Sequence, residues 1–327
     1  MLTWPISRSR IASIKNIILW RKRIMLMNMK ELLAVANENN FAVPAFNISD
    51  YSMFNGIMEA SEEKNAPVII AIHPDELSHI GTDMVKAIIE KAHKATVPVC
   101  IHLDHGASFE QVMTAIQAGF TSVMIDGSSL PFEENIKACK KVAEAAHAVN
   151  VSVEGELGTI GSTDAVTLDV EAFAGTAGST DAEAEAGANV IIYTNPDDAV
   201  KFVEASGVDT LAIAIGTSHG IYPKGMKPEL KLDLLKEIKS KVSIPLVLHG
   251  GSNNPDAEIG QSVTLGVNKI NISSDIKVAY YDKMREVLAD KGLREPNTIQ
   301  PPCIAAMKEV AFHKIELFQA DGKAALY

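Results

Sequence analysis

Cysteine is scarce in this 327-residue chain, and basic residues are outnumbered. Cys100, Cys139 and Cys303 are odd in number and far apart, so there is neither a disulfide framework nor a Cys-x-x-Cys zinc pattern, which favours a cytoplasmic protein. The 30 Lys and Arg against 41 Asp and Glu give a net charge of −11. This balance argues against nucleic acid as a partner, because phosphate backbones bind basic faces. No apolar run reaches the ~20 residues of a membrane span.

The first thirty residues differ from the rest because they carry seven basic residues and no acidic one. Such a segment is similar to a transit peptide, but it lacks the apolar core of a secretory signal. Met25, Met27 and Met29 crowd its end. We therefore interpret residues 1–28 as a basic N-terminal extension, either a disordered tail or a mis-assigned start, ahead of a single domain over residues 29–327.

From Met29 onward, short apolar runs alternate with longer amphipathic segments, the pattern of βα units in a parallel sheet. Eight strands are predicted, at Ala42–Phe46, Val68–His73, Pro98–Asp104, Ser122–Asp126, Val151–Glu156, Thr210–Gly216, Ile244–His249 and Asn268–Ile272. The helices predicted between and after them are Tyr51–Lys64, Thr82–Ala95, Phe109–Ala118, Phe132–Val149, Pro196–Ser206, Glu229–Lys241, Pro255–Leu265 and Asp275–Asp290.

Eight βα units in about 250 residues predict a closed (β/α)₈ barrel, the TIM barrel. A doubly wound open sheet is the alternative, but the turn after the first strand, Asn47–Asp50, has no Gly-x-Gly-x-x-Gly fingerprint. Helices at Met29–Asn37 and Ile304–Leu317 fall outside the eightfold pattern. The predicted fold is thus an α/β TIM barrel with an extra N-terminal helix and an extra C-terminal helix.

Polar side chains follow most of the predicted strands at the point where each strand ends. They include Asn47, Asp104, His105, Asp126, Glu154, Glu156, His219, His249 and Asn271. The carboxyl ends of barrel strands converge on one face, so these groups are expected to share one mouth. Three histidines without cysteine partners are suited to a catalytic zinc, or a related metal, with an open coordination position.

Two turns at this predicted mouth are candidates for a phosphate site. Gly250–Ser252 and Asn271–Ser274 each open a helix, and loops after strands 7 and 8 of such barrels often bind phosphate. Either turn alone is equally well explained as a helix cap. Beside a histidine-bound metal, the two together favour a phosphorylated substrate. Asp104 is then placed to move a proton on a substrate hydroxyl while the metal acts as a Lewis acid, which describes a retro-aldol cleavage.

Seven motifs, in order between Met29 and Phe318, resemble those of the class II, metal-dependent ketose-bisphosphate aldolases. They are IHLDHG at Ile101–Gly106, GFTSVMID at Gly119–Asp126, PFEEN at Pro131–Asn135, VEGELG at Val153–Gly158, GTSHG at Gly216–Gly220, LVLHGGS at Leu246–Ser252 and KINIS at Lys269–Ser273. The resemblance implies that His105, His219 and His249 hold one Zn²⁺ and that Asp104 is catalytic. Glu156 and Asp126 would match positions that bind a shifted metal, or a second divalent or monovalent cation.

The same resemblance implies a dihydroxyacetone-phosphate site with Asn47 lining the mouth. Its residues would be Gly220, Gly250, Gly251, Ser252, Asn271, Ile272, Ser273 and Ser274. Family members cleave fructose or tagatose 1,6-bisphosphate to dihydroxyacetone phosphate and glyceraldehyde 3-phosphate, usually as homodimers or homotetramers. A related phosphorylated ketose is the alternative substrate.

Two departures from the family pattern stand out. The loop after the fifth strand is long, and Gly158–Ala165 recurs as Gly175–Ala182, which indicates a local duplication. Asp164, Asp181 and Glu183 in this loop are the candidates for the acid that exchanges the substrate proton. Near the C-terminus, Pro301–Lys308 lacks the arginine that fructose-bisphosphate members often place there, so the sequence leaves the substrate open.

Two other kinds of protein were weighed. A metal-dependent TIM-barrel hydrolase is expected to show His-x-His after the first strand, where this chain has Phe46-Asn47-Ile48. A non-catalytic scaffold of the same family conflicts with the presence of Asp104 and all three histidines. An aldolase is therefore the predicted function.

Overall fold

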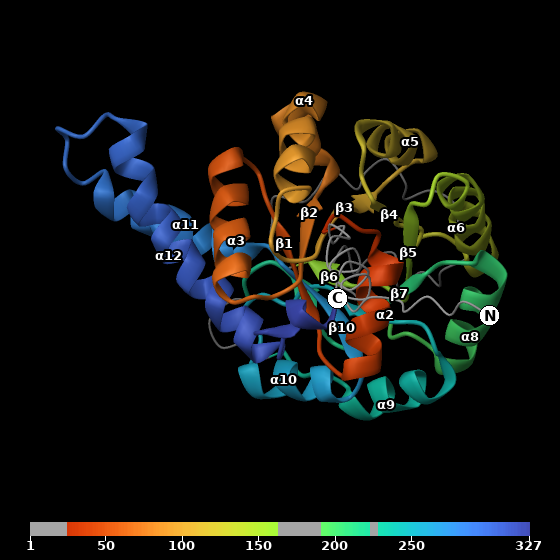
Figure 1. The fold of residues 1–327 in the computed structure, drawn as a ribbon. Helices are drawn as coiled ribbons and strands as arrows, with labels where there is room; N and C mark the ends of the chain where they lie inside the picture. Colours follow the sequence, from red (N-terminus) through yellow and green to blue (C-terminus); the bar gives the residue numbers. More distant parts are fainter. Residues whose placement is uncertain (1–24, 163–190, 223–227) are drawn as a thin grey trace, which may run out of the picture.

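A closed barrel of eight parallel strands forms the centre of the structure, a computed structural model that describes residues 25–162, 191–222 and 228–327. The strands run in the order β1-β10-β9-β7-β5-β4-β3-β2, and helices surround them (Figure 1). Pairing of β1 with β10, which brings Phe46 beside Ile272, closes the barrel. The predicted (β/α)₈ fold is confirmed.

All eight predicted strands are present. They are β1 (Val43–Asn47), β2 (Val68–Ile72), β3 (Val99–Gly106), β4 (Ser122–Ile125), β5 (Ser152–Leu157), β7 (Thr210–Ile213), β9 (Leu246–Leu248) and β10 (Val267–Ile272). Nearly every residue in them is buried, because helices cover the outer face and side chains fill the inside. This double burial explains why the strands read as continuous apolar runs rather than as alternating patterns.

The described helices follow the strands as predicted. They are α3 (Tyr51–Glu63), α4 (Pro74–Ala92), α5 (Phe109–Ala118), α6 (Phe132–His147), α8 (Pro196–Ser206), α9 (Leu232–Lys241), α10 (Asp256–Thr264) and α11 (Ser274–Val287), with α2 (Met29–Asn39), α12 (Pro296–Leu317) and the 3₁₀-helix η3 (Lys323–Leu326) outside the repeat. Capping sets several starts: the carboxylate of Asp50 accepts a hydrogen bond from the Met53 amide at 2.7 Å.

Two helices begin earlier than predicted. Helix α4 starts at Pro74 instead of Thr82, because the side chains of His73 and Glu76 form a capping box there. Gly81, with φ 73°, interrupts the helix just before the predicted start. Helix α12 starts at Pro296 instead of Ile304, with Pro296 in its first turn, and it continues through Pro301 and Pro302 although proline usually interrupts helices.

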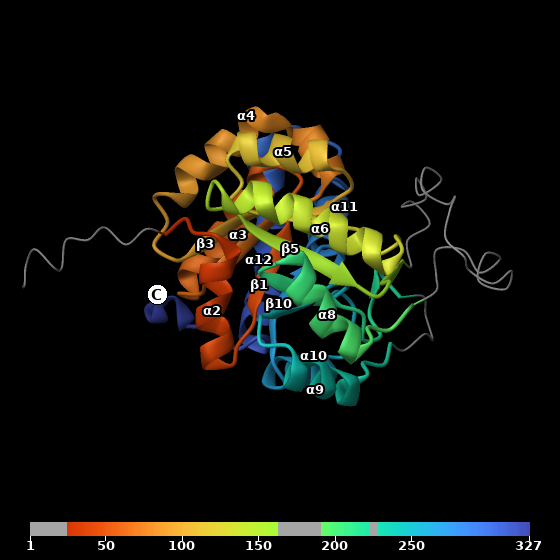
Figure 2. The ribbon, with the colours of Figure 1, turned by 90° about the vertical axis from the view of Figure 1, so that its right-hand side faces the viewer.

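Helices α11 and α12 lie side by side and project from the barrel (Figure 1). At the other end of α12 the chain returns to the barrel, and Figure 2 places the C-terminus beside α2. There the Tyr327 hydroxyl donates a hydrogen bond to the Leu32 carbonyl at 2.8 Å. None of the described helices is long and apolar enough to cross a membrane.

Residues 25–28, which the sequence placed in the basic extension, contact the barrel. The Val99 amide donates to the Met25 carbonyl at 2.7 Å, and the Met27 amide donates to the Val99 carbonyl at 2.9 Å. The Asn28 side chain then caps α2. The rest of the extension, residues 1–24, lies outside the described residues.

Gly106, at the end of β3, provides a test of how closely the barrel is packed. A Cβ at this position would lie 2.5 Å from the Met124 carbonyl oxygen, which belongs to the rigid neighbouring strand β4. We predict that Gly106→Ala lowers the free energy of unfolding by ~1–3 kcal/mol, the usual cost of overpacking, as measured by urea denaturation. Gly260→Ala is the control, because its added Cβ would make an ordinary 3.4 Å contact with Leu317. Equal stability of the two variants would contradict this account.

Candidate metal and substrate site

Three histidines meet at the carboxyl ends of the barrel strands. His105 lies in β3, His219 in the short strand β8 (Ser218–His219), and His249 directly after β9. One ring nitrogen from each lies within 4.8 Å of the others. The ring centroids of His105 and His249 are 4.5 Å apart, and those of His105 and His219 are 5.0 Å apart. Three strands distant in sequence thus deliver three imidazoles to one point.

A second, two-stranded sheet holds the His219 segment. Strand β6 (Gly161–Ser162), which follows β5, pairs in parallel with β8 and brings Ser162 beside His219. Thr159 and Ile192 exchange two backbone hydrogen bonds, of 2.9 and 3.1 Å, at the two ends of the long loop. The sequence did not predict this sheet, because two-residue strands have no periodicity. Asp164, Asp181 and Glu183 lie outside the described residues.

In His105 and His249, the ring nitrogen that points away from the other histidine contacts a carboxylate. His105 Nδ1 lies 2.8 Å from Asp126 Oδ2, and His249 Nε2 lies 2.7 Å from Glu154 Oε1. The ionised carboxylates only accept hydrogen bonds, so these two ring nitrogens donate. The remaining nitrogens, His105 Nε2 and His249 Nδ1, face each other at 2.8 Å. This carboxylate–histidine pairing is the arrangement that orients metal-ligating imidazoles.

The three rings differ sharply in their proton affinity. Burial opposes a charge on His105, but Asp104 and Asp126 outweigh it and raise the pKa of this ring to about 10. Burial and the charge on His105 lower the pKa of His219 to about 3, and they also lower the pKa of His249. Among the three rings, His105 is therefore the one that carries an extra proton when no cation is bound. A bound metal would displace it, since ligating imidazoles must be deprotonated.

Glu156 supplies a further sign that the site is built for a cation. His105, Asp126 and Glu156 form a second group of ligand atoms within 4.8 Å of one another. Among the described residues, Glu156 Oε2 is buried and has no hydrogen-bond partner. Burial, followed by the charge of Asp126, raises the pKa of Glu156 well above its usual value. A buried carboxylate oxygen beside two other ligands fits a metal-binding position, because such an oxygen is costly when unpaired.

Asp104 lies on β3 between two amides. Its Oδ2 accepts a hydrogen bond from Asn47 Nδ2 and its Oδ1 accepts one from Asn271 Nδ2, each at 2.9 Å. Burial disfavours its charge, but His105 and His249 hold the pKa of this carboxylate well below its usual range. Asp104 is therefore ionised and fixed in position, as a proton acceptor must be. Asn47 and Asn271, expected to line the substrate site, also orient this carboxylate.

The two predicted phosphate turns lie together at the ends of β9 and β10. The Gly251 amide donates to the Asn271 carbonyl at 3.0 Å, which joins the turns. A Cβ on Gly250 would lie 2.6 Å from the Ser218 carbonyl oxygen, and the φ of 61° at Gly250 also favours glycine. The Ser252 hydroxyl accepts a hydrogen bond from the Asp275 amide at 3.3 Å, in the first turn of α11.

These contacts decide which groups remain for a phosphate. The Gly251 N–H already donates to the Asn271 carbonyl of β10. The turn Gly250–Ser252 therefore offers a phosphate one backbone donor fewer than the sequence suggests. Ile272 ends β10, and Ser273 and Ser274 begin α11, where the helix N-terminus favours an anion. Gly220, with φ 97°, follows His219 directly. All eight predicted phosphate residues thus lie at the end of β10 or directly after β8, β9 or β10.

Asn254 and Lys269 were given no role by the sequence, and Glu154, expected at the mouth, lies in the barrel interior. The Asn254 amide donates to the Gly250 and Ser252 carbonyls at 2.7 and 2.8 Å and so shapes the glycine turn. Glu154 and Lys269 form a fully buried ion pair beneath His249. A lysine within a predicted buried strand was the available signal, because buried lysines are almost always paired. His102 is fully buried inside the barrel, with its Nδ1 2.9 Å from the Ser122 hydroxyl.

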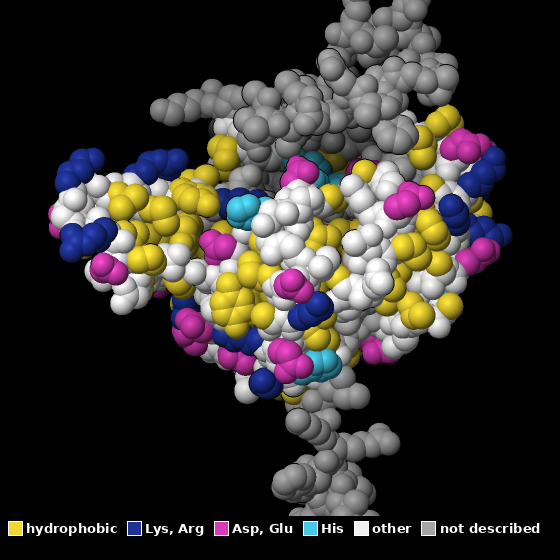
Figure 3. Space-filling model, turned by 90° about the horizontal axis from the view of Figure 1, so that it is seen from above, with side chains coloured by type: hydrophobic (Ala, Val, Ile, Leu, Met, Phe, Trp, Pro, Cys, Tyr) yellow, Lys and Arg dark blue, Asp and Glu magenta, His cyan; other side chains and the backbone are white. Residues whose placement is uncertain are grey.

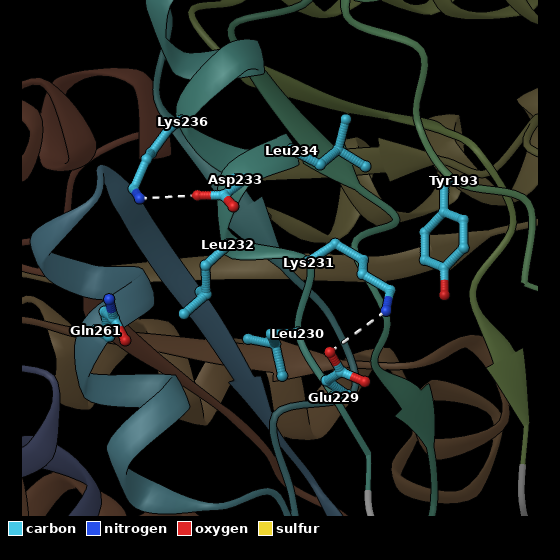
Figure 4. Close-up of a pocket in the computed structure, with 9 residues that line it drawn as sticks. All are labelled: Tyr193, Glu229, Leu230, Lys231, Leu232, Asp233, Leu234, Lys236 and Gln261. Atoms are coloured by element: carbon cyan, nitrogen blue, oxygen red, sulfur yellow. Dashed lines mark hydrogen bonds and ion pairs between the residues drawn. The ribbon is translucent and has the colours of Figure 1, made fainter.

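A separate groove of about 610 Å³ lies beside α9. Figure 4 shows Tyr193 on one side of it and residues 229–234 and 236 on the other. Its lysines are already paired, Lys231 with Glu229 and Lys236 with Asp233. None of the three histidines lines this groove, so it is distinct from the cluster at the strand ends.

Comparison with known proteins identifies the family. The family described as class-II fructose-bisphosphate aldolase matches residues 27–323. The chain belongs to this class II aldolase family. The fructose-bisphosphate aldolase of Staphylococcus epidermidis (strain RP62A) is 39% identical over 305 residues, which cover 91% of this chain and 99% of that protein. The probable fructose-bisphosphate aldolase of Bacillus subtilis (strain 168) shows the same identity and coverage.

Solved structures agree with the class II aldolase assignment. The YdjI aldolase of Escherichia coli K12 superimposes with a TM-score of 0.77 at 33% identity, covering 92% of this chain and all of that one. The predicted resemblance is confirmed, and this protein is an aldehyde-lyase of a metal-dependent family that acts on phosphorylated sugars. The hydrolase and scaffold alternatives are not supported.

Glu156 leads to a testable pH dependence. In the metal-free folded protein, the raised pKa of Glu156 keeps this carboxyl group protonated at pH values above 4.5, at which the unfolded residue is already ionised. Unfolding then releases a proton, so this residue's contribution to stability falls as the pH rises above 4.5. We predict that Glu156→Gln, which mimics the protonated form, is more stable than the wild type at pH 8, and that this advantage vanishes near pH 4.5. Urea denaturation in the presence of chelator measures it; an advantage independent of pH would refute the assignment.

Proposed function

We propose that this protein is a zinc-dependent class II aldolase that reversibly cleaves a ketose 1,6-bisphosphate to dihydroxyacetone phosphate and glyceraldehyde 3-phosphate. The observation that carries the proposal is the convergence of His105, His219 and His249 beside the ionised Asp104. Fructose 1,6-bisphosphate is the first substrate to test, because the relatives from Staphylococcus epidermidis and Bacillus subtilis carry its name. Tagatose 1,6-bisphosphate or another phosphorylated ketose remains the alternative.

The three histidines would hold one Zn²⁺, and Glu156, with Asp126, would serve a shifted metal or a second cation. When bound, the metal supplies Lewis-acid stabilisation of the negative charge that cleavage leaves on the substrate. The nitrogen-rich, cysteine-free donor set fits zinc with an open coordination position. Asp126 also keeps the His105 ring oriented through its 2.8 Å contact.

Asp104 would accept the proton from the substrate hydroxyl as the carbon–carbon bond breaks, and return it in the reverse direction. Asn47 and Asn271 hold both of its oxygens, so the carboxylate meets the hydroxyl without first reorienting. The substrate phosphate would lie against Gly220, Gly250–Ser252 and the start of α11 at Ser273 and Ser274. One of Asp164, Asp181 and Glu183 would exchange the proton on the three-carbon product.

We propose that the protein forms a homodimer or homotetramer in the cytoplasm. In each subunit, residues 29–327 would form one aldolase domain that follows the basic N-terminal extension, residues 1–28. Val278, Tyr281 and Leu288 are each more than 40% exposed on or next to α11. Figure 3 shows hydrophobic side chains gathered on the projecting hairpin, with Lys and Arg at its edge. An exposed apolar patch of this kind is typical of an interface between subunits.

A coupled assay on fructose and tagatose 1,6-bisphosphates tests the function. We predict cleavage of at least one substrate, loss of activity after complete metal removal with a chelator, and recovery on adding Zn²⁺. Activity that survives complete metal removal would refute the metal-dependent mechanism. Failure to cleave any ketose phosphate would refute the function.

Replacement of Asp104 tests its role in proton transfer. We predict that Asp104→Asn lowers kcat by ~10²–10⁴-fold, the usual contribution of a general acid–base group, with little change in KM. The variant is expected to retain bound zinc, because Asp104 contacts asparagines rather than serving as a ligand. Metal content measured by atomic emission is the control, and full turnover with bound metal would exclude Asp104 as the proton acceptor.

A further inference from the structure

A charged cluster in the barrel interior is not used by the mechanism above. It consists of Glu154 on β5, Lys269 on β10 and His102 on β3, all with no exposed side-chain surface. The Glu154 carboxylate is its centre. Lys269 Nζ donates to both carboxylate oxygens, at 3.0 and 2.8 Å. His102 Nε2 lies 3.8 Å from Glu154 Oε2.

Glu154 connects this cluster to the candidate metal site. Its Oε1 accepts a hydrogen bond from His249 Nε2 at 2.7 Å as well as one from Lys269. Two contacts from Lys269 prevent the carboxylate from rotating, so the direction of the bond to His249 is fixed. The other nitrogen of that ring, Nδ1, then faces His105 Nε2 at 2.8 Å.

Fold stability does not account for this arrangement. Burying two charges costs several kcal/mol per ion, and a well-packed apolar pair of similar volume is often as stable or more so. The charged pair therefore calls for a role beyond packing.

We propose that Glu154, held in place by Lys269, is a positioning residue for the metal: it keeps the Nε2 proton on His249 and so presents the Nδ1 lone pair to the cation. This inference rests on the proposed metal site. Asp126 makes the equivalent contact with His105, but from the mouth rather than from the barrel core. The charge of Glu154 also makes the His249 imidazole a stronger electron-pair donor to a metal. Loss of such partners typically weakens metal binding ~10–100-fold.

A buried aspartate elsewhere in the chain provides a matched control. Asp209 Oδ1 lies 2.9 Å from Lys30 Nζ, and its Oδ2 lies 2.8 Å from His147 Nε2. Like Glu154, it is a buried carboxylate with a lysine and a histidine among its partners, and it also accepts from the Val153 amide at 2.9 Å. None of these partners belongs to the candidate metal site. Asp209→Asn therefore reports the cost of losing such a charge without touching His249.

The test compares four proteins: the wild type, Glu154→Gln, the double variant Glu154→Gln/Lys269→Met, and Asp209→Asn. Zn²⁺ affinity is measured by competition with a chromophoric chelator, and stability by urea denaturation of the metal-free proteins. Both Glu154 variants are expected to bind Zn²⁺ ~10–100-fold more weakly than the wild type. The double variant should be more stable than Glu154→Gln, because it removes the unpaired buried ammonium. Asp209→Asn should lose stability and keep wild-type affinity.

If Glu154 positions the metal, the double variant therefore gains stability over Glu154→Gln but binds Zn²⁺ as weakly as Glu154→Gln does. Wild-type affinity in either Glu154 variant would overturn the inference and leave the proposed function intact. Recovery of affinity in the double variant alone would show that the unpaired lysine, rather than loss of the carboxylate, weakens binding, which also overturns it. Parallel loss of affinity in Asp209→Asn would indicate a general effect of instability and overturn it as well. Absence of Zn²⁺ binding by the wild type would instead refute the proposed metal site itself.

Discussion

The 2.8 Å approach of His105 Nε2 to His249 Nδ1 is the contact on which the rest of the site depends. The partly buried His105 and the buried His249 point ring nitrogens at each other, an arrangement that is favourable only with a shared proton or a bound cation. Asp126 and Glu154 fix both rings from behind. His219 and Glu156 border the same point, and the ionised Asp104 lies next to His105 in the chain. The chemistry of the site follows from this convergence.

The barrel supplies the precision that this contact requires. His105 extends from β3, and His249 directly follows β9. Glu154 on β5 and Lys269 on β10 lie next to His249 in the barrel interior. Each side chain is therefore anchored on, or directly after, a strand that hydrogen bonds to two others. Loops contribute less: the glycine turn after His249 is itself held by Asn254 and by the bond to Asn271. A rigid core beneath a variable rim is the arrangement that lets this fold carry many reactions.

Sequence patterns predicted the eight strands because both faces of each are buried, which produces unmistakable apolar runs. They also predicted the convergence of His105, His219 and His249, since the carboxyl ends of barrel strands share one face. They did not predict the partners of these residues: the Asp126 and Glu154 contacts depend on side-chain directions across the barrel. The hydrogen bond from the Gly251 amide to the Asn271 carbonyl was not predicted either, because the register between distant strands has no local sequence signature. The starts of α4 and α12 were missed because proline marks both helix starts and helix interruptions.

The central claim is that His105, His219 and His249 together bind one metal ion. X-ray absorption spectroscopy at the zinc edge of the zinc-loaded protein tests it most directly, because imidazole rings give distinctive multiple scattering. The account predicts three imidazole nitrogens at about 2.0–2.1 Å, with oxygen in the remaining coordination. A spectrum with fewer than three imidazoles, or with sulfur at about 2.3 Å, would contradict it.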